Sequence, residues 1–380
     1  MNWIALKMLT GNRGKYIGIV FGIAFASLLI SHQASVFCGL MRQTGGQIRD
    51  IQGADMWIMD PNVQFSDDIK PLSDSDLYRV RGVPGVAWAV RLYKGLARLR
   101  LEDGNFQQVI LLGLDDATLV GVPPVMITGD FRDLRKPDAV IMDEEGYHLL
   151  WPNDKEPRIG RRFEMNDHEA EIIGICKASR TFQTFPVVYT RYTQALDFVP
   201  KERKTLSFVL ADAEQGQSVK DVCQRIEKQT GLRAITGPQF EWITMFYFLR
   251  KTGIPFSFGI TVSLGFIVGT AIAAQTFYLF TIENLKQFAA LKAMGAGNST
   301  MLTMILLQAL LVSVIGFGLG IGVASIFGTF AAKYNLRLAF YMPVEVFVGT
   351  AVAVVVISMI SSVLSMLRVT VVDPAVVFQG

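Results

Sequence analysis

Four long apolar segments constrain the fold of this chain more than any other feature. A transmembrane α-helix needs about 20 consecutive residues that are mostly apolar. Four segments meet this requirement, and we predict transmembrane helices at residues 16–37, 251–282, 301–332 and 344–367. Residues 38–250 have the polar content of an ordinary folded domain. The sequence therefore predicts one membrane helix, a folded domain, and then three further membrane helices.

The overall composition agrees with a membrane protein. Hydrophobic residues make up 51% of the chain and charged residues 18%, whereas soluble domains carry about 25% charged residues. The mean hydropathy is +0.36. The net charge of +3 is too small to indicate a nucleic-acid partner, because proteins of that class carry strongly basic patches.

The first apolar segment has an alternative interpretation as a cleaved signal peptide. Lys7, Arg13 and Lys15 would form its basic region. The apolar stretch is longer than that of a usual signal peptide, and Gln33-Ala34-Ser35 is a poor cleavage site. We therefore expect that this segment stays in the membrane as the first helix.

The distribution of Lys and Arg predicts the orientation of the helices, because short cytoplasmic segments carry the excess of these residues. The short loop 333–343 carries only Lys333 and Arg337. Arg250 and Lys251, beside the second helix, act against the assignment. The side that would hold both termini carries Lys7, Arg13, Lys15, Lys286, Lys292 and Arg368. We therefore expect both termini in the cytoplasm.

The predicted fold is an α-helical membrane protein with four transmembrane helices and a mixed α/β extracytoplasmic domain inserted between helices 1 and 2. A cytoplasmic amphipathic helix at residues 1–15 precedes the first span. The remaining segments are a cytoplasmic loop with a short helix at 283–300, a short outer loop at 333–343 and a cytoplasmic tail at 368–380.

The insert combines strand and helix signals. Two predicted hairpins have polar turns between runs of alternating or apolar residues. A helix is predicted at Ser218–Thr230, with Ser218 as a possible N-cap and Gly231 as its end. The predicted strands are Val86–Tyr93, Leu96–Leu101 and Gln107–Gly113, then Ala139–Asp143, Arg161–Met165 and Ala170–Lys177, then Leu206–Ala211 and Arg233–Thr236.

Motifs for catalysis or nucleotide binding were not found in the sequence. It contains no G-x-x-x-x-G-K-[ST] phosphate-binding loop and no G-x-S-x-G or H-E-x-x-H motif. Asp115-Asp116 and Asp143-Glu144-Glu145 are interpreted as solvated turns. We assign no catalytic, cofactor-binding or metal-binding residue, and His148 and His168 are interpreted as surface residues.

A few polar residues leave two interpretations open. His32 lies near the outer end of the first span, so it belongs either to the membrane interface or to a transport path. Cys176 and Cys223 are either buried thiols or, outside the cytoplasm, a disulfide, and Cys38 shows no metal-binding spacing with them.

Glycines spaced four residues apart predict close helix contacts within the membrane. They form either a sliding interface in a bundle or dimer, or reflect the ordinary glycine content of membrane helices. The pairs are Gly265 with Gly269, Gly316 with Gly320, and Gly318 with Gly322. The predicted helix-packing residues are Gly265, Gly269, Gly316, Gly320 and Gly322.

The segment after the second span is the most specific in the chain. Its residues 288–296, Phe-Ala-Ala-Leu-Lys-Ala-Met-Gly-Ala, resemble the cytoplasmic loop of FtsX/MacB-type permeases of ABC transporters. Gln287 stands where that family usually has Glu. Residues 372–378, Val-Asp-Pro-Ala-Val-Val-Phe, resemble the family's closing signature, and Ile159-Gly160 with Ile173-Gly174-Ile175 resembles its MacB-like periplasmic core. The layout of the whole chain is similar, and within the family it looks most like the DevC-like exporters.

This resemblance implies a permease in the bacterial inner membrane. Its partners would be a separate P-loop ATPase that uses ATP and Mg, a second copy of the chain, a periplasmic adaptor protein and membrane lipids. No cofactor would bind this chain. The ATPase-coupling residues would be Glu283, Leu285, Lys286, Gln287, Phe288, Ala290, Leu291, Lys292, Ala293, Gly295 and Ala296.

The chemistry of this loop suggests how it would act. We expect Leu285, Phe288 and Leu291 to be apolar anchors on the ATPase, and Lys286 and Lys292 to meet acidic groups or lipid phosphates. The loop could alternatively be a connector that lies on the inner leaflet. Gly295 would end its helix, and Asn298 or Ser299 would cap the next one.

Three functions remain open at this stage. In an exporter of hydrophobic or amphipathic substrates, the second span, expected to be continuous with residues 242–251, would carry ATP-driven motion to the outer domain. The same layout would suit an FtsX-like signalling or scaffold protein that regulates an outer partner without transport. An enzyme with its active site in the insert is the third alternative, and no nucleophile–base set supports it.

Overall fold

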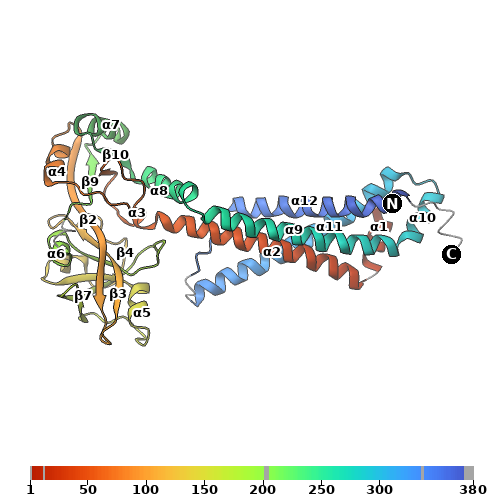
Figure 1. The fold of residues 1–380 in the computed structure, drawn as a ribbon, viewed down its shortest axis with the longest axis horizontal. Coiled ribbons are helices and arrows are strands. Elements are labelled where there is room, and N and C mark those ends of the chain that lie inside the picture. Colours follow the sequence, from red (N-terminus) through yellow and green to blue (C-terminus); the bar gives the residue numbers. More distant parts are fainter. Residues whose placement is uncertain (1, 12, 201–204, 335–337, 372–380) are drawn as a thin grey trace. The chain divides into compact units, whose positions relative to one another are not determined.

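The computed structural model describes residues 2–11, 13–200, 205–334 and 338–371 (Figure 1). The chain forms two compact units. Residues 1–40 and 253–380 make up a helical unit, and residues 41–252 make up a sheet unit. The expected insert, 38–250, thus differs from the sheet unit by a few residues at each end.

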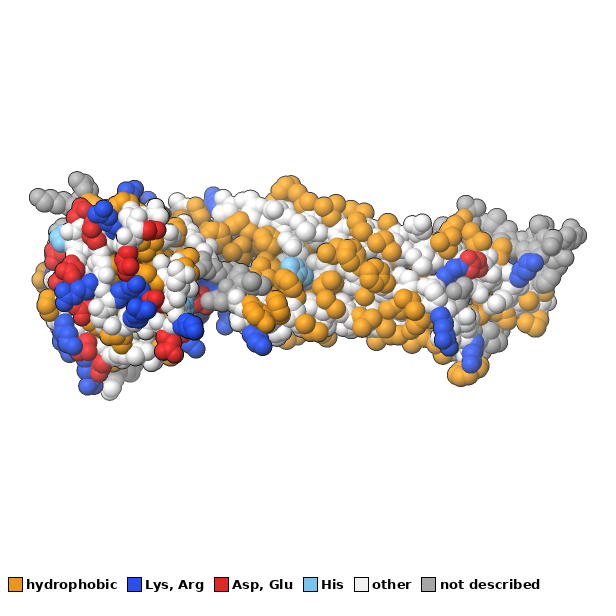
Figure 2. All heavy atoms as spheres, turned by 90° about the horizontal axis from the view of Figure 1, so that it is seen from below, with side chains coloured by type: hydrophobic (Ala, Val, Ile, Leu, Met, Phe, Trp, Pro, Cys, Tyr) orange, Lys and Arg blue, Asp and Glu red, His pale blue; other side chains and the backbone are white. Residues whose placement is uncertain are grey.

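The helical unit contains four helices that are long and apolar enough to cross a membrane, among the residues that the structure describes. They are α2 (Arg13–Thr44), α9 (Ile254–Glu283), α11 (Asn298–Lys333) and α12 (Val344–Val371). Two shorter helices, α1 (Asn2–Gly11) and α10 (Leu285–Ala293), complete the unit. On the face drawn in Figure 2, hydrophobic and uncharged side chains cover the long middle part of this unit, and its charged side chains gather near its ends. They correspond to the four predicted spans. Helices α2, α11 and α12 extend a few residues beyond the predicted bounds, whereas α9 begins three residues later than the predicted 251–282.

The second span is not continuous with the helix before it, which corrects the sequence-based expectation. Helix α8 (Gly237–Lys251) ends at Thr252, whose backbone is extended with φ −118° and ψ 158°. Helix α9 then begins at Ile254 with Pro255 in its first turn. Proline lacks the N–H that would bond to the carbonyl four residues earlier, so it favours a break at this point.

Four of the predicted packing glycines lie against α2. A Cβ added at Gly265 or Gly269 would meet Leu29 or Ala26, and one added at Gly316 or Gly320 would meet residues 23–27 of the same helix. The contacts therefore pack the helices within one chain. Gly318 and Gly322 have open space at the Cβ position among the described residues, so Gly322 does not take part in this packing within one chain, and its place in a dimer interface stays a prediction.

Serine side chains form a second type of helix contact that the sequence analysis did not identify. On α12, Ser358, Ser361 and Ser365 are buried and face α9 and α11. Ser365 donates to the carbonyl oxygen of Phe277 at 3.0 Å, and Ser313 lies 2.5 Å from Ser358. The spacing of three, four and seven residues along α12 places these hydroxyls on one helix face, and such bonds hold membrane helices together.

The sheet unit is built on one mixed sheet in the described part of the chain. The order along the sheet is β10-β1-β9-β2-β3-β8-β5-β7-β4. Strand β6 pairs with both β2 and β7, so β2, β3, β8, β5, β7 and β6 form a closed ring. The strands are β1 (Met56–Met59), β2 (Val86–Arg100), β3 (Phe106–Leu114), β4 (Val125–Thr128), β5 (Ala139–Asp143), β6 (Arg162–Met165), β7 (His168–Lys177), β8 (Val187–Arg191), β9 (Phe208–Ala213) and β10 (Arg233–Thr236).

Helices cover two hydrophobic clusters of the sheet unit. One cluster includes apolar residues of α4, α5, α6 and α7, and the other includes residues of α3 and α8 and of the 3-10 helix η1. The remaining helices of the unit are α3 (Gly46–Asp50), α4 (Asp74–Arg81), η1 (Phe131–Arg135), α5 (Glu144–Leu150), α6 (Tyr192–Asp197) and α7 (Val219–Thr230).

Both predicted hairpins and the predicted helix are confirmed, with changed bounds. The two strands expected at Val86–Tyr93 and Leu96–Leu101 are one strand, β2, which pairs with β3 from Leu92 to Arg100. Ser218 occupies the N-cap position of α7, although it makes no side-chain cap bond, and Gly231 ends the helix with φ +71°. Glu144 and Glu145, interpreted as part of a solvated turn, begin helix α5. Strands β1, β4 and β8 were not predicted.

Cys176 and Cys223 are free buried thiols. Cys176 belongs to the cluster beneath α3 and α8, and Cys223 belongs to the cluster beneath α4 and α7. The disulfide alternative is therefore excluded for this structure. Burial raises the pKa of Cys223 to about 11, so its thiol stays protonated at neutral pH.

Candidate coupling site

The short helix α10 forms a sharp corner between α9 and α11. Helix α9 ends when the backbone N–H of Asn284 and its side-chain amide both donate to the carbonyl of Phe280, at 3.2 and 2.7 Å. Helix α10 ends at Ala293 with Met294 as its C-cap, and Gly295 then turns the chain with a φ of +94°, which favours glycine because a Cβ is strained there. Gly295 thus ends this helix as predicted. Gly297 occupies the N-cap of α11 without a side-chain bond, so the predicted caps Asn298 and Ser299 are wrong.

One side of α10 is buried in the bundle. Phe288 is 1% exposed, Ala289 3% and Leu291 7%. Phe288 and Leu291 share a hydrophobic cluster with Ala5, Met8 and Leu9 of α1 and with Phe277 and Phe280 of α9. The Ala296 N–H donates to the carbonyl of Leu291 at 3.0 Å, which closes the corner against the start of α11. Helix α10 is therefore attached to the membrane helices through its apolar side chains.

This burial corrects the expected role of the apolar anchors. A side chain can bind another protein directly only if it is exposed, and Phe288 and Leu291 are packed inside this chain. Leu285 is half-buried. The exposed side of the corner instead carries Lys286, Gln287, Ala293, Met294 and Gly295, and Met294 is 76% exposed. Sequence reasoning identified the segment and missed Met294, which is exposed just after helix α10 ends at Ala293.

Helix α1 lies at the same end of the helical unit as α10 (Figure 1). The amide of Gln308, buried in α11, donates to the carbonyl of Ala5 at 2.7 Å. The ammonium of Lys15, at the start of α2, pairs with Glu283, at the end of α9. A polar side chain inside a membrane helix is costly and marks a functional or structural contact. Gln308 is thus a second residue that the sequence analysis missed, and its only signal was its place within a predicted span.

The structure also places the other residues that the sequence analysis singled out. Glu283 belongs to α9, and the other coupling residues from Leu285 to Ala293 belong to α10. His32 packs its ring edge-on to Phe327, with ring centres 5.1 Å apart. The closing signature at residues 372–378 lies outside the described residues. Among the described residues, no group of three or more His, Cys, Asp or Glu side chains is placed to hold a metal ion.

Several contacts connect α10 with the rest of the helical unit. The corner joins it to α9 and α11, the shared cluster joins it to α1, and the Lys15–Glu283 pair joins α9 to α2. Closely packed elements move together because interiors are dense and have few voids.

Comparison with known families decides the identity of the chain. Residues 16–229, more than half of the chain, match the family described as MacB-like periplasmic core domain. Residues 244–374 match the family described as FtsX-like permease C-terminal. The chain belongs to the FtsX/MacB-like permeases of ABC transporters. The second match contains α9, α10 and α11, so α10 and its corner lie wholly within it.

Related permeases share most of this chain's length. An uncharacterized ABC transporter permease of Mycobacterium tuberculosis is 25% identical over 368 residues, which cover 96% of this chain and 93% of the relative. An uncharacterized ABC transporter permease of Mycobacterium bovis is 24% identical over 310 residues, covering 82% and 80%. The solved periplasmic region of MacB from Actinobacillus actinomycetemcomitans is 15% identical with a TM-score of 0.39, covering 51% of this chain and 94% of that structure.

Proposed function

We propose that this permease is the membrane subunit of an ABC exporter in which a separate P-loop ATPase binds the exposed side of α10. The observation that carries the proposal is the division of α10 into two sides. Phe288 and Leu291 attach the helix to the bundle, while Lys286, Gln287 and Met294 face outward. A helix with these two sides can receive a push and pass it on.

ATP binding would draw two ATPase subunits together and move α10, and with it α9, α11 and α1. Because α8 and α9 are separate helices, this motion would reach the sheet unit through the extended residue Thr252 and Gly253 rather than through one rigid rod. ATP and Mg would belong to the ATPase. The cargo class remains hydrophobic or amphipathic molecules, which suits export from or along a membrane.

The proposed setting follows from the positive charges and from the family. The permease would lie in a bacterial inner membrane with both termini and α10 in the cytoplasm and with the sheet unit outside. A second copy would pair with it in the membrane, and α9 is the least covered of the four long helices, since only 17% of its most apolar stretch is buried in this chain. A periplasmic adaptor would meet the sheet unit.

Substitutions on the exposed side of α10 test this function. We expect Met294→Asp and Lys286→Glu each to reduce the amount of P-loop ATPase that co-purifies with the tagged permease by about 10-fold, because a charge placed at an interface lacks a partner there. The matched control is Lys333→Glu, the same charge reversal at the exposed C-terminal end of α11. The measurement is quantitative mass spectrometry of the gently extracted complex.

The burial of Leu291 determines how the test is designed. Leu291→Asp would place a charge inside the bundle, so it should lower the yield of folded permease and would not isolate the ATPase contact. A normal ATPase yield with both Met294→Asp and Lys286→Glu would contradict the proposed binding surface. An adaptor protein in the wild-type eluate would favour export over signalling.

A further inference from the structure

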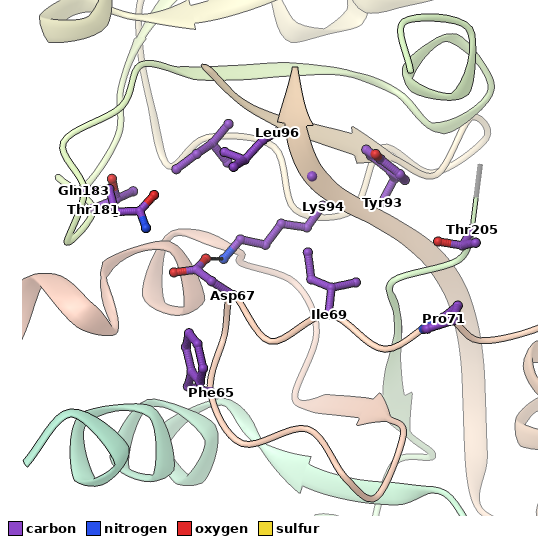
Figure 3. Close-up of a pocket in the computed structure, with 12 residues that line it drawn as sticks. Phe65, Asp67, Ile69, Pro71, Tyr93, Lys94, Leu96, Thr181, Gln183 and Thr205 are labelled. Carbon is purple, nitrogen blue, oxygen red and sulfur yellow. Dashed lines mark ion pairs between the residues drawn. The ribbon is translucent and has the colours of Figure 1, made fainter. Parts of the chain in front are cut away.

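The sheet unit contains a cavity that the proposed coupling function does not use. Its volume is about 540 Å³, within the range of about 300–1,000 Å³ that is typical of small-molecule sites. It opens between strand β2, the segment between β1 and α4, and the segment around residues 181–183 (Figure 3). Its apolar walls are Phe65, Ile69, Pro71, Leu96 and Ile110.

A buried lysine lies in the middle of this cavity. Lys94 is on β2, and its side chain is only 6% exposed. Its ammonium lies 2.6 Å from the carboxylate of Asp67 and 3.2 Å from the carbonyl oxygen of Ser66 (Figure 3). Burying a charged group is costly unless it is paired, so this cation needs an anion at that place.

The two members of the ion pair differ in their freedom to move. The Asp67 side chain is 41% exposed and belongs to an irregular segment, whereas Lys94 is fixed on a central strand. The Asp67 side chain can rotate towards the solvent, which leaves the Lys94 ammonium to another anion. The Lys94 ammonium is enclosed instead, because its side chain is only 6% exposed and its backbone is held by pairing with Leu112 on β3 and a bond to Ser207.

A second polar group in the cavity is unsatisfied. Thr181 is 7% exposed, and its hydroxyl has no hydrogen-bond partner among the described residues. It lines the cavity together with Gln183, at the end toward which the Lys94 ammonium extends (Figure 3). A buried hydroxyl without a partner is unfavourable, and a ligand in the cavity would supply the missing one.

The wall around Asp67 is held in place before any ligand arrives. The Ser66 N–H donates to the hydroxyl of Thr244 on α8 at 3.2 Å. The ring of Phe65 stacks on Tyr247 of the same helix, with ring centres 4.3 Å apart. A preformed wall reduces the entropy that a ligand must lose on binding.

We propose that this cavity binds a small amphipathic molecule with an anionic group. The anion takes the place of the Asp67 carboxylate at the Lys94 ammonium, the hydroxyl of Thr181 bonds to a polar atom of the ligand, and the apolar part lies against Phe65, Ile69 and Ile110. The proposal goes beyond the coupling function and does not depend on it, because ATPase association is measured separately.

The experiment measures binding of radiolabelled dodecanoate to the full-length permease in phosphatidylcholine nanodiscs, with the signal of empty nanodiscs subtracted. We expect saturable binding. Unlabelled dodecanoate should compete with the labelled ligand, and dodecanol should not. Lys94→Met should weaken binding by about 10-fold, because it removes a charge-assisted bond. Thr181→Val should weaken it by about 5-fold and should fold normally, because it replaces an unsatisfied hydroxyl with a methyl group of similar size.

Asp67→Asn gives the sharpest test, because it should tighten binding several-fold by removing the competing carboxylate. The matched control is Lys70→Met, whose ammonium pairs with Asp68 at 3.0 Å and does not line the cavity. This variant should bind dodecanoate as the wild type does. All variants should retain their co-purifying ATPase, so a failure here is distinct from a failure of the coupling proposal.

Three results would overturn the proposal. These are the absence of saturable binding, equal competition by dodecanol, and affinities that do not change in Asp67→Asn and Thr181→Val. Nanodiscs that contain phosphatidylglycerol identify the source of the anion. Competition of this lipid with dodecanoate points to a lipid headgroup, and the absence of such competition points to a free acid. Both of these outcomes keep an anionic amphipathic ligand in the cavity.

Discussion

Asp143 shows at the residue scale how burial and backbone bonds compete for one carboxylate. It ends β5 and caps α5, and its two oxygens accept from the N–H groups of Gly146 at 2.7 Å and Val187 at 2.6 Å. These bonds favour the charged form. Burial outweighs them and raises the pKa of Asp143 from 3.8 to about 6.

This raised pKa gives a pH-dependent stability. The folded chain holds the proton more tightly than the unfolded chain, so the contribution of Asp143 is full below pH 3.8 and is lost as the pH rises to about 6. The loss is roughly 3 kcal/mol. Asn cannot titrate, and its amide cannot accept the second backbone bond. We therefore expect Asp143→Asn to be destabilising, and its cost to be larger at pH 4 than at pH 7.

Thermal unfolding followed by tryptophan fluorescence measures this difference, since Trp57, Trp88, Trp151 and Trp242 all belong to the sheet unit. The matched control is Asp103→Asn, in an exposed turn where hydrogen bonds from Asn105 lower the pKa. The cost of that substitution should grow as the pH rises. A cost of Asp143→Asn that also grows with pH would contradict the assigned burial effect.

At the scale of elements, the contact between α9 and α2 depends on small residues. Gly269 lies so close to Ala26 that an added Cβ would overlap the Ala26 side chain. Close approach of this kind lets van der Waals contacts and serine hydrogen bonds hold membrane helices together. The same helix has open space at Gly259 among the described residues, which makes the two glycines a matched pair.

We expect Gly269→Ala to destabilise the helical unit by about 1–3 kcal/mol, because overpacking forces the helices apart. Gly259→Ala should be neutral or slightly stabilising, since alanine has the higher helix propensity. Resistance to denaturation by sodium dodecyl sulfate in mixed micelles measures both. Equal effects of the two substitutions would show that the α2–α9 contact does not depend on the missing side chain.

At the scale of the whole molecule, the orientation in the membrane is the property that organises the proposed function. Under the proposed function both termini and α10 would lie in the cytoplasm with the ATPase, and the sheet unit would lie outside. The large sheet unit itself gives no information about orientation, because long domains are translocated regardless of their charge.

Cysteine labelling in intact spheroplasts tests this orientation. A cysteine at Asn105, in the exposed turn between β2 and β3, should react with a membrane-impermeant maleimide, and a cysteine at exposed Met294 should react only after lysis. Buried Cys176 and Cys223 contribute little background, and Cys38→Ser removes the remaining thiol. Labelling of the Met294 position in intact spheroplasts would show that α10 lies outside the cytoplasm, and it would contradict the proposed contact with a cytoplasmic ATPase.

The sequence determined the features that depend on neighbouring residues. The four apolar spans follow from local composition, and the two hairpins follow from alternation on either side of a polar turn. The ends of α7 and α10 follow from Gly231 and Gly295, because glycine takes up a positive φ without strain. The motif at residues 288–296 was enough to indicate the family.

Only the tertiary structure decided which side of each helix or strand is buried and which other elements cover it. The sequence placed Phe288 and Leu291 on α10, but their burial depends on α1, which is about 280 residues away along the chain. The cavity around Lys94 combines three segments that are distant in sequence. Such contacts depend on how distant elements pack, and local periodicity carries no information about them.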